Sequence, residues 1–420
     1  GEHQHQQKQR GGTGGGNDNW QHDVYNAGAM FEAAVHYYRA TGKTPLVKIA
    51  ARMANYMADF IGPAPRKNVV PGHSIAEEAL VKFYRLFVEH PELKQQMPVA
   101  VDENRYLRLA EFFIEARGHH EGRASFGPYG QDHKPVFQQE SIEGHAVRAT
   151  LMAAGVTAIA EANNRPEYAT AARRLWENFI GRRLYITGGA GAIAGNEAFA
   201  PDYVLPNDGY LETCAAIGGA FFDHDLNLLT GEARCADELE RVLYTSAPAG
   251  VSLAGDTYSY VNPLQYERGH SRWKWHGCPC CPPMFLKIMG ALPGYVFAKN
   301  DRGLTVNLFI GSRAETSIQG QPVTVRLSTR YPWEGAVRLE VSPAAEREFD
   351  VRIRVPVWCQ QEPSPDALYW LQGEPASGAF HVKVNGQEQP SLTMERGYAV
   401  LHRVWRKGDV VDVTMDMPVR

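Results

Sequence analysis

The sequence is poor in cysteine, has no long apolar run and carries little net charge, and each shortage excludes a class of protein. Six cysteines in 420 residues are too few for a disulfide scaffold. No segment approaches the ~18 consecutive apolar residues of a membrane span, and the N-terminus lacks the apolar core of a signal peptide. A net charge of −4 with scattered lysine and arginine gives no footprint for nucleic acid or an anionic membrane. We therefore expect a soluble protein of the bacterial cytoplasm or periplasm that binds neither.

A phosphate-binding loop is also missing, although glycine is plentiful near the N-terminus. Residues 1–19 are polar and glycine-rich without periodicity, which predicts a loop or a partly disordered segment. No Gly-Lys-Ser/Thr follows the glycines at 11–16, and no strand pattern precedes them. The glycines therefore do not indicate a nucleotide site.

From Val24 onward the sequence repeats the pattern of a helical hairpin. A helical run ends at Gly42, and Thr44 and Pro45 then supply an N-cap and a first-turn proline for the next helix. We count about four helix pairs and one further helix after Cys281. The pairs centre on residues 41–45, 75–114, 163–166 and 229–231. Successive αα-hairpins without intervening strands predict a toroid or solenoid of helices.

After Gly303 the period changes from helical to alternating. Short strands of period two, separated by turn signals such as Asn385 and Gly386, predict an all-β sandwich. The predicted strands are residues 304–308, 323–327, 337–341, 350–357, 380–384 and 410–415. We place the boundary near residues 298–303, which gives a helical catalytic domain over residues 1–300 and a β-sandwich domain over 301–420.

Half of the cysteines, Cys278, Cys280 and Cys281, fall within four positions. A disulfide between adjacent cysteines would be strained, because its geometry needs two Cα atoms ~5.5 Å apart with a fixed torsion. A metal is the more natural reason for such a cluster. Thiolates are soft ligands that suit zinc, and a distant segment commonly completes a tetrahedral site.

The best second segment contains Glu212 and Cys214. A spacing of two residues does not place both on one face of a regular helix, so we expect them at a loop-to-helix junction. A structural zinc site usually has paired Cys-x-x-Cys arms, whereas these two segments lie about 65 residues apart. The arrangement favours an active-site metal, with inert buried thiols as the alternative. A metal-bound thiolate that faces a cleft could act as a nucleophile.

Other candidate residues lie in loops beside the predicted helices. They are His73, His145, Glu197 and the segment 256–260. A lone histidine is more often a hydrogen-bonded residue at a helix end than a ligand, and Glu197 alone could be a solvated loop residue. Cys235 and Cys359 stand apart from the cluster, and we expect them to be buried structural thiols.

Six motifs together resemble those of a known family. They are residues 143–148, 195–199, 205–207, 212–215, 250–253 and 277–282. They look like glycoside hydrolase family 127, the β-L-arabinofuranosidase family, and the pair Glu-Thr-Cys-Ala and Cys-x-Cys-Cys-Pro is specific. The likeness runs from about Tyr25 to the end of the chain. The resemblance implies an (α/α)6 barrel followed by a β-sandwich, in a retaining glycoside hydrolase that binds zinc and attacks the sugar with a cysteine.

Carried over by motif, the resemblance also implies roles for individual residues. The zinc ion would be held by Glu212, Cys214, Cys280 and Cys281. Cys280 would be the nucleophile and Glu197 the acid/base of a retaining mechanism. Sugar contacts would come from His73, His145, Tyr258 and Tyr260. The implied partner is an oligosaccharide or polysaccharide of the plant cell wall, of the pectin or arabinan type.

Two departures from the family bear on the substrate and on coverage. Ala29 stands where the family usually has a histidine, which removes a polar contact to the sugar. Related enzymes release aceric acid, a carboxylated sugar, from rhamnogalacturonan II. Hydrolysis of the glycosidic bond of aceric acid in that pectin is therefore the alternative activity. Arg10, Arg66 or Lys67 could serve that carboxylate, although loop cations are more often solvated. Four hairpins fall short of six, so we expect the chain to lack pieces that the family has at both ends.

Two rival functions come from other classes. One is a non-catalytic carbohydrate-binding or scaffold protein whose zinc only staples helices together. The other is a lyase acting on uronates, since helical toroids also host that chemistry. Loss of turnover in Cys280→Ser with the fold and metal kept would exclude the first, and a lyase would release an unsaturated product that absorbs ultraviolet light. The sequence does not indicate an oligomeric state.

Overall fold

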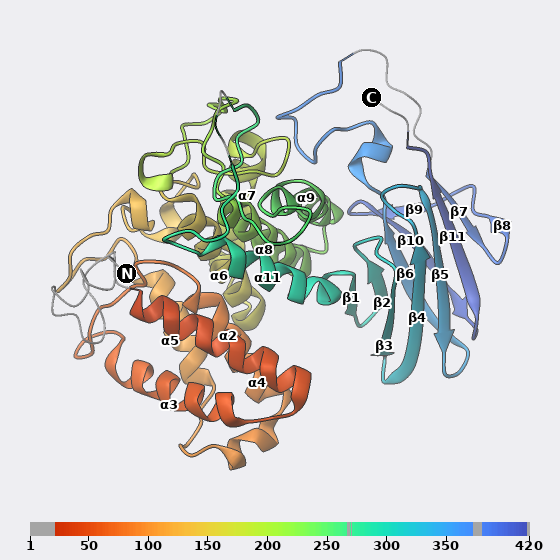
Figure 1. Ribbon diagram of the computed structural model, residues 1–420. Helices are drawn as coiled ribbons and strands as arrows, with labels where there is room; N and C mark the ends of the chain where they lie inside the picture. The colour runs from red at the N-terminus through yellow and green to blue at the C-terminus, as the bar shows by residue number, and fades with distance from the viewer. Residues whose placement is uncertain (1–21, 267–268, 270, 373–379, 418–420) are drawn as a thin grey trace. The chain divides into compact units, whose positions relative to one another are not determined.

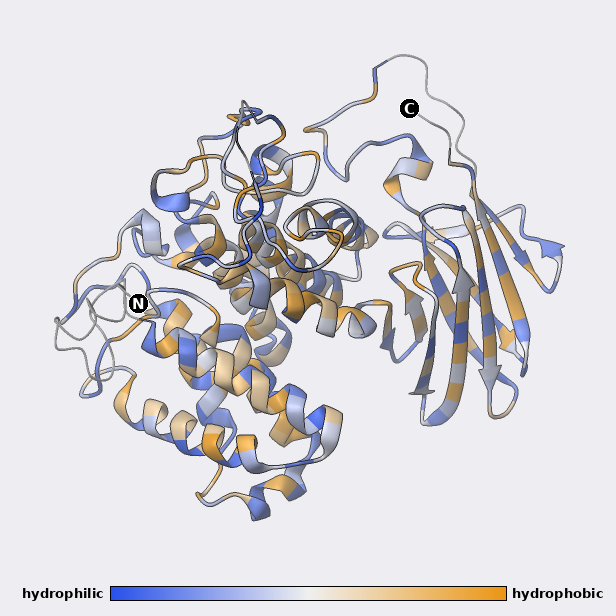
Figure 2. Cartoon of the chain, viewed as in Figure 1, coloured by the Kyte–Doolittle hydropathy of each residue, from blue (hydrophilic) through white to orange (hydrophobic). Residues whose placement is uncertain are grey.

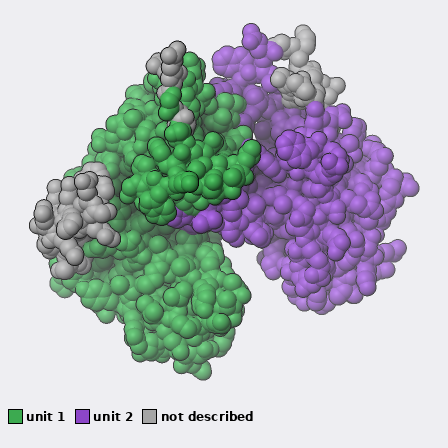
Figure 3. All heavy atoms as spheres, in the orientation of Figure 1, with its two compact units in different colours: residues 1–229, 245–282 green, residues 230–244, 283–420 purple. Residues whose placement is uncertain are grey.

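The computed structural model describes residues 22–266, 269, 271–372 and 380–417. The predicted N-terminal loop, with Arg10, lies outside the described residues. The chain divides into two compact units, coloured in Figure 3, which comprise Gly1–Leu229 with Thr245–Pro282 and Thr230–Tyr244 with Pro283–Arg420. Division into domains at residue 300 remains a prediction. No helix in the described part of the chain combines the length and apolar character that a bilayer crossing requires.

Helices arranged largely as hairpins occupy the chain from Asp23 to Ala291, as the sequence predicts (Figure 1). The α-helices are α2 (Asp23–Thr41), α3 (Pro45–Phe60), α4 (Ala76–Glu89), α5 (Asn104–Glu115), α6 (Ala146–Asn163), α7 (Pro166–Asn178), α8 (Thr213–Thr230), α9 (Ala233–Tyr244), α10 (Ser246–Ala249) and α11 (Cys281–Ala291). Shorter turns are η1 (Pro91–Gln96), η2 (Pro128–Gly130), η3 (Val136–Gln138), η4 (Phe179–Arg183), η5 (Gly195–Glu197), η6 (Leu292–Tyr295) and η7 (Val357–Gln360). The four predicted hairpins are therefore confirmed, as is the helix predicted after Cys281, which begins at Cys281 itself.

The turns between paired helices follow the expected chemistry. Gly42 ends α2 in the left-handed conformation, at φ 68°, and its N–H donates to the carbonyl of Tyr38 at 2.7 Å. Asn164 ends α6 in the same way, at φ 55°. Pro45 and Pro166 then occupy the first turn of α3 and α7, where a missing N–H costs nothing. These two hairpins thus turn within a few residues, whereas α4 and α5 are joined by residues 90–103, which include η1.

The helices α2, α4, α6 and α8 pack closely through small residues. A Cβ at Gly28 of α2 would lie 2.7 Å from the Cα of Ala76, and one at Gly218 of α8 would lie 2.3 Å from Oγ1 of Thr150 in α6. Only glycine allows so close an approach. The ring of Tyr25 in α2 lies 4.8 Å from that of His73, just before α4, which lies 5.7 Å from that of His145, just before α6. The N-terminal ends of these helices therefore meet, with their partial positive charge.

The strands of the second unit form two sheets with one shared core. Their bounds are β1 (Phe297–Asn300), β2 (Gly303–Val306), β3 (Ser312–Ile318), β4 (Gln321–Thr329), β5 (Ala336–Pro343), β6 (Arg347–Arg354), β7 (Phe380–Val384), β8 (Gln387–Glu388), β9 (Thr393–Glu395), β10 (Tyr398–Trp405) and β11 (Asp409–Met415). The strand orders are β1-β2-β6-β10-β9 and β3-β4-β5-β11-β7-β8. Hydrophobic and hydrophilic residues alternate along these strands in Figure 2, and the apolar set of both sheets forms the core. The predicted sandwich is confirmed.

Helix α9 packs within this second unit. The guanidinium of Arg354 in β6 is fully buried and pairs with Asp237 and Glu240 of α9, and the hydroxyl of Tyr331 donates to Oε1 of Glu240 at 2.7 Å. Cys235 in α9 and Cys359 in η7 are buried thiols, as predicted. The sequence did not predict that α9 pairs with a strand.

Candidate active site

The two segments predicted to share a metal begin two helices. Cys214 lies in the first turn of α8, and Glu212 is the residue immediately before this helix. Cys281 is the first residue of α11. The start of α8 also pairs with a later segment, because the N–H of Thr213 donates to the carbonyl of Tyr260 at 2.9 Å. The expected loop-to-helix junction is therefore present. Partial positive charge at the first turn of a helix favours thiolates and carboxylates there.

The ligand atoms of Glu212, Cys214, Cys280 and Cys281 all lie within 4.8 Å of one another, so this group could hold a metal ion. Sγ of Cys214 lies 3.3 Å from Sγ of Cys281, and Sγ of Cys280 lies 3.7 Å from Oε1 of Glu212. Oε2 of Glu212 is buried and makes no hydrogen bond. A buried carboxylate oxygen without a partner is unfavourable unless a cation is bound. The donor set therefore fits a metal.

The acidity of these groups points the same way. Burial, with Cys280 and Glu197 close by, raises the pKa of Glu212 well above its usual value. Burial and the neighbouring thiols also raise the pKa of Cys214. Hydrogen bonds from Cys214 and Cys280 lower that of Cys281 to about 6. Four acidic groups this close cannot all ionise without a compensating cation.

Glu197 lies beside this cluster on the turn η5 and is held by three donors. Its Oε2 lies 2.6 Å from Nε2 of His145, and its Oε1 accepts the hydroxyls of Tyr210 at 3.0 Å and Tyr260 at 3.1 Å. Burial opposes ionisation of Glu197, but these three hydrogen bonds outweigh it and lower the pKa of the carboxyl. The same Tyr260 hydroxyl lies 3.6 Å from Sγ of Cys280. One side chain thus touches both predicted catalytic residues.

His145 is oriented by the helix that it begins. It is the N-cap of α6, and its Nδ1 accepts the N–H of Arg148 at 3.4 Å. Since Nδ1 is an acceptor, the proton of the neutral ring is assigned to Nε2, which donates to Glu197. Burial and the nearby guanidinium of Arg148 keep the pKa of His145 below its usual value. The imidazole therefore stays neutral and holds one tautomer.

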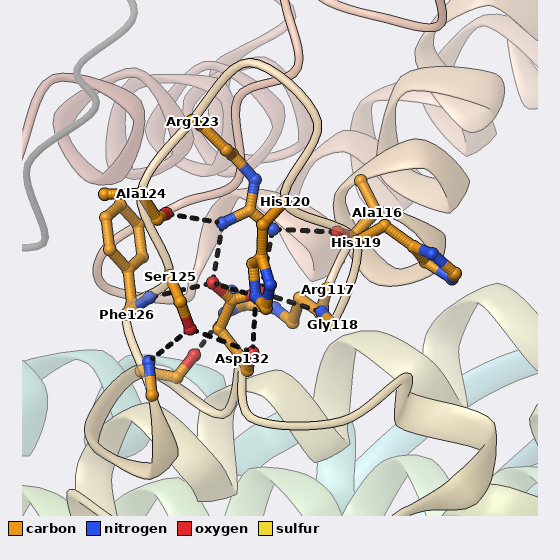
Figure 4. Close-up of polar contacts among 12 residues, drawn as sticks. Ala116, Arg117, Gly118, His119, His120, Arg123, Ala124, Ser125, Phe126 and Asp132 are labelled. Atoms are coloured by element: carbon orange, nitrogen blue, oxygen red, sulfur yellow. Dashed lines mark hydrogen bonds and ion pairs between the residues drawn. The ribbon is translucent and has the colours of Figure 1, made fainter.

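The loop between α5 and α6 supports this arrangement (Figure 4). Asp132 is fully buried and accepts two hydrogen bonds from Arg123, at 2.6 and 2.7 Å, and the backbone N–H groups of Gly118 and Phe126 at 2.8 and 2.9 Å. Burial opposes the charge on Asp132, but these bonds lower its pKa. The loop then presents Tyr129, whose ring lies 5.4 Å from that of His145.

The other predicted residues divide between the site and its surroundings. His73 lies in the ring cluster with Tyr25 and His145. Tyr258 pairs through its backbone with Trp273 and lines a small hollow together with Tyr260. Arg66 and Lys67 line a different surface groove, between the loop that follows α3 and the C-terminal end of α5. Cys278 is exposed and is not in the four-residue metal group.

Two residues of the site were missed in the sequence. Tyr210 donates to Glu197, and Arg148 stacks on the ring of Tyr129, with its guanidinium carbon 4.2 Å from the ring centroid. Arg148 lies inside the motif at residues 143–148, and Tyr210 lies two residues before the motif at residues 212–215. The spacing of neither residue indicates such a contact. Only their positions beside Glu212 and His145 could have pointed to them.

Comparisons with known proteins agree with this geometry. Residues 3–294 match a family model described as the catalytic domain of glycoside hydrolase family 127, β-L-arabinofuranosidase, and residues 303–417 match the middle domain of the same family. A curated relative, the non-reducing end β-L-arabinofuranosidase of Bifidobacterium longum subsp. longum, is 30% identical over 433 residues, which cover 94% of this chain and 60% of the relative.

Solved structures give the same result. A family 127 β-arabinofuranosidase superposes with a TM-score of 0.85 at 38% identity, over 94% of this chain and 60% of that one. A family 127 β-L-arabinofuranosidase from Geobacillus stearothermophilus T6 superposes with a TM-score of 0.83 at 33% identity, over 95% and 62%. These neighbours fit the predicted (α/α)6 barrel with a β domain. The chain spans about three fifths of the length of the relatives that it matches. It belongs to glycoside hydrolase family 127.

Proposed function

We propose that this chain carries the active site of a retaining glycoside hydrolase that releases β-L-arabinofuranose from the non-reducing end of a plant cell-wall glycoside. The observation that carries the proposal is the Tyr260 hydroxyl, which lies 3.1 Å from Glu197 and 3.6 Å from Cys280. A proton donor and a nucleophile thus flank a single point beside a metal-binding group. The names of the relatives supply the sugar.

The metal of this proposal is Zn²⁺, held by Glu212, Cys214, Cys280 and Cys281. Tetrahedral zinc with Zn–S bonds of about 2.3 Å places its ligand atoms about 3.8 Å apart. Separations of 3.3 to 4.0 Å within the group support this assignment. When bound, zinc would hold Cys280 as the thiolate and make its sulfur a better leaving group.

In the first step, Sγ of Cys280 attacks the anomeric carbon. A carbon–sulfur bond forms as the glycosidic carbon–oxygen bond breaks, and Glu197 gives its proton to the leaving oxygen. The three donors around Glu197 favour its carboxylate, so its acid form is populated at lower pH. We therefore expect this step to slow as the pH rises through the lowered pKa of Glu197.

In the second step, Glu197 acts as a base. It takes a proton from water, which attacks the anomeric carbon while the carbon–sulfur bond breaks and the Cys280 thiolate is restored. Two inversions leave the configuration unchanged. His73, His145 and Tyr258 are proposed to contact the sugar, with His145 also holding Glu197 in place.

The test is hydrolysis of 4-nitrophenyl β-L-arabinofuranoside by the zinc-loaded protein, with the anomer of the first product followed by NMR. Retention is expected. Cys280→Ser should reduce kcat by roughly a thousandfold or more, and Glu197→Gln should affect this activated leaving group less than an alkyl one. Cys235→Ala, which removes a buried thiol of α9, is the control. Full activity of Cys280→Ser, or inversion of the anomeric centre, would contradict the proposal.

A further inference from the structure

An exposed tryptophan stands next to the candidate nucleophile. Trp275 is 74% exposed, although burying a side chain of this size contributes several kcal/mol in a folded protein. It lies five residues before Cys280, in the described segment 271–280. Large aromatic side chains left in water beside a cleft commonly mark a binding surface.

The segment around Trp275 is held in place by its neighbours. The backbone of Trp273 exchanges two hydrogen bonds with that of Tyr258, at 2.8 and 2.9 Å. The ring of Trp273 lies 4.7 Å from that of His276, which lies 5.1 Å from that of Tyr260. Nδ1 of His276 accepts the N–H of Cys278 at 3.1 Å. Trp275 is therefore presented on a fixed turn.

The rings form a path from the buried end of the site to solvent. Tyr260, which contacts Glu197, is buried, while His276 is half-buried and Trp275 is exposed. Tyr258, Tyr260, Trp275 and His276 line one hollow, together with Cys278. In the proposed function the terminal sugar lies between Glu197 and Cys280, beside the buried Tyr260. The next unit of the substrate would then extend toward the exposed end.

We propose that Trp275 is a stacking platform for the sugar on the leaving-group side of the scissile bond, so that the site prefers a glycoside whose aglycone is a second sugar ring. This inference rests on the proposed function. The C–H face of a sugar ring is apolar, and a flat indole covers it without needing hydrogen bonds. Stacking on Trp275 should therefore raise kcat/KM only for substrates whose aglycone is a sugar ring.

The experiment compares kcat/KM for a disaccharide, β-L-arabinofuranose linked to a second pentose, with kcat/KM for methyl β-L-arabinofuranoside. Trp275→Ala should lower the ratio of the two values about tenfold, and Trp275→Phe should keep most of it. Trp333→Ala is the matched control, because Trp333 is 86% exposed in the second unit. Equal loss on both substrates, or loss on neither, would overturn the inference.

Binding separates this inference from the proposed function. Calorimetry measures the affinity for the disaccharide in the absence of turnover. The two proteins compared are Cys280→Ser and the double variant Cys280→Ser with Trp275→Ala. A wild-type chain that cleaves neither substrate, with binding that depends on Trp275, would remove the proposed function and support the platform. Binding that does not depend on Trp275, or no binding at all, would overturn the platform even if hydrolysis occurs.

Discussion

Two buried carboxyl groups of the helical unit have opposite surroundings. Asp132 receives four hydrogen bonds, two of them from a guanidinium, and its pKa is lowered. Glu212 lies against thiols and has one oxygen without any partner, and its pKa is raised well above the usual value. Burial is nearly the same for both side chains, so the partners decide the charge.

This difference distinguishes a carboxylate with a structural role, Asp132, from a candidate metal ligand, Glu212. Asp132 is already neutralised by Arg123, and nothing further is needed to keep it buried. Glu212 has no cation within its group, yet its position at the start of α8 places it with three sulfurs. A buried acid without a partner is hard to explain by packing, whereas a metal ligand is expected to have this environment.

Among the substitutions that test this comparison, Asp132→Asn should have the largest effect on the free energy of unfolding. Removal of the charge leaves Arg123 buried without its partner, which should lower the free energy of unfolding by about 3–5 kcal/mol. Urea denaturation of the metal-loaded protein at neutral pH measures it. The exposed Asp208→Asn, whose effect should stay within about 0.5 kcal/mol, is the control. An equally small effect at both positions would show that Asp132 is not structural.

The corresponding amide substitution at position 212, Glu212→Gln, should lower the affinity for the metal and have little effect on stability. The raised pKa of Glu212 favours the protonated carboxyl in the metal-free protein, and Glu212→Gln is close to isosteric with that form. We expect the unfolding free energy of the metal-free protein to change by less than about 1 kcal/mol, while zinc affinity falls at least about tenfold. Competition with a chromophoric chelator gives the affinity. Unchanged zinc affinity would exclude Glu212 as a ligand.

The pH dependence of stability should also differ in sign between the two carboxyls. The lowered pKa of Asp132 adds stability above its unfolded value of about 3.9, and this is lost as the pH falls through the folded value. The raised pKa of Glu212 adds stability below about 4.3, which is lost as the pH rises toward and through the folded value. Unfolding of metal-free wild type, Asp132→Asn and Glu212→Gln across this range would resolve the two. A variant with the wild-type profile would refute its own assignment.

A smaller effect is expected at Tyr210, where the surroundings of Glu197 resemble those of Asp132. Tyr210→Phe removes one of three donors, so the pKa of Glu197 should rise and its acid form should persist to higher pH. The basic limb of the kcat/KM profile should move to higher pH, with kcat reduced by about threefold to tenfold. The pH profile is the decisive measurement, because a merely structural loss would lower activity without moving the limb.

Local signals in the sequence predicted the helical hairpins and the metal group. Gly42 and Pro45 mark a turn by their own backbone preferences, and these survive in any tertiary context. Cys280 and Cys281 indicate a metal because a disulfide between adjacent cysteines would be strained. Glu212 and Cys214 form the best second pair of ligand residues in the sequence. The structure brings all four together.

Contacts that depend on distant backbone could not be predicted. Tyr210 donates to Glu197 from a segment in which the next residue, Leu211, has a left-handed conformation, at φ 45°. The residue types in this segment do not predict that conformation. Asp237 and Glu240 look like the solvated face of α9, but Arg354 covers them, from more than a hundred residues later. The pairing of Arg123 with Asp132 is equally invisible, since it lies in a loop without periodicity.

Because His145 makes contacts through both ring nitrogens, the acid/base role proposed for Glu197 depends on the integrity of one helical turn. Its Nδ1 caps α6 while its Nε2 holds Glu197, so fraying of that turn would free the ring to exchange tautomers and release the carboxyl. Warming should therefore erode turnover before the barrel melts. The highest temperature at which the proposed hydrolase turns over substrate would then be limited by the end of a single helix.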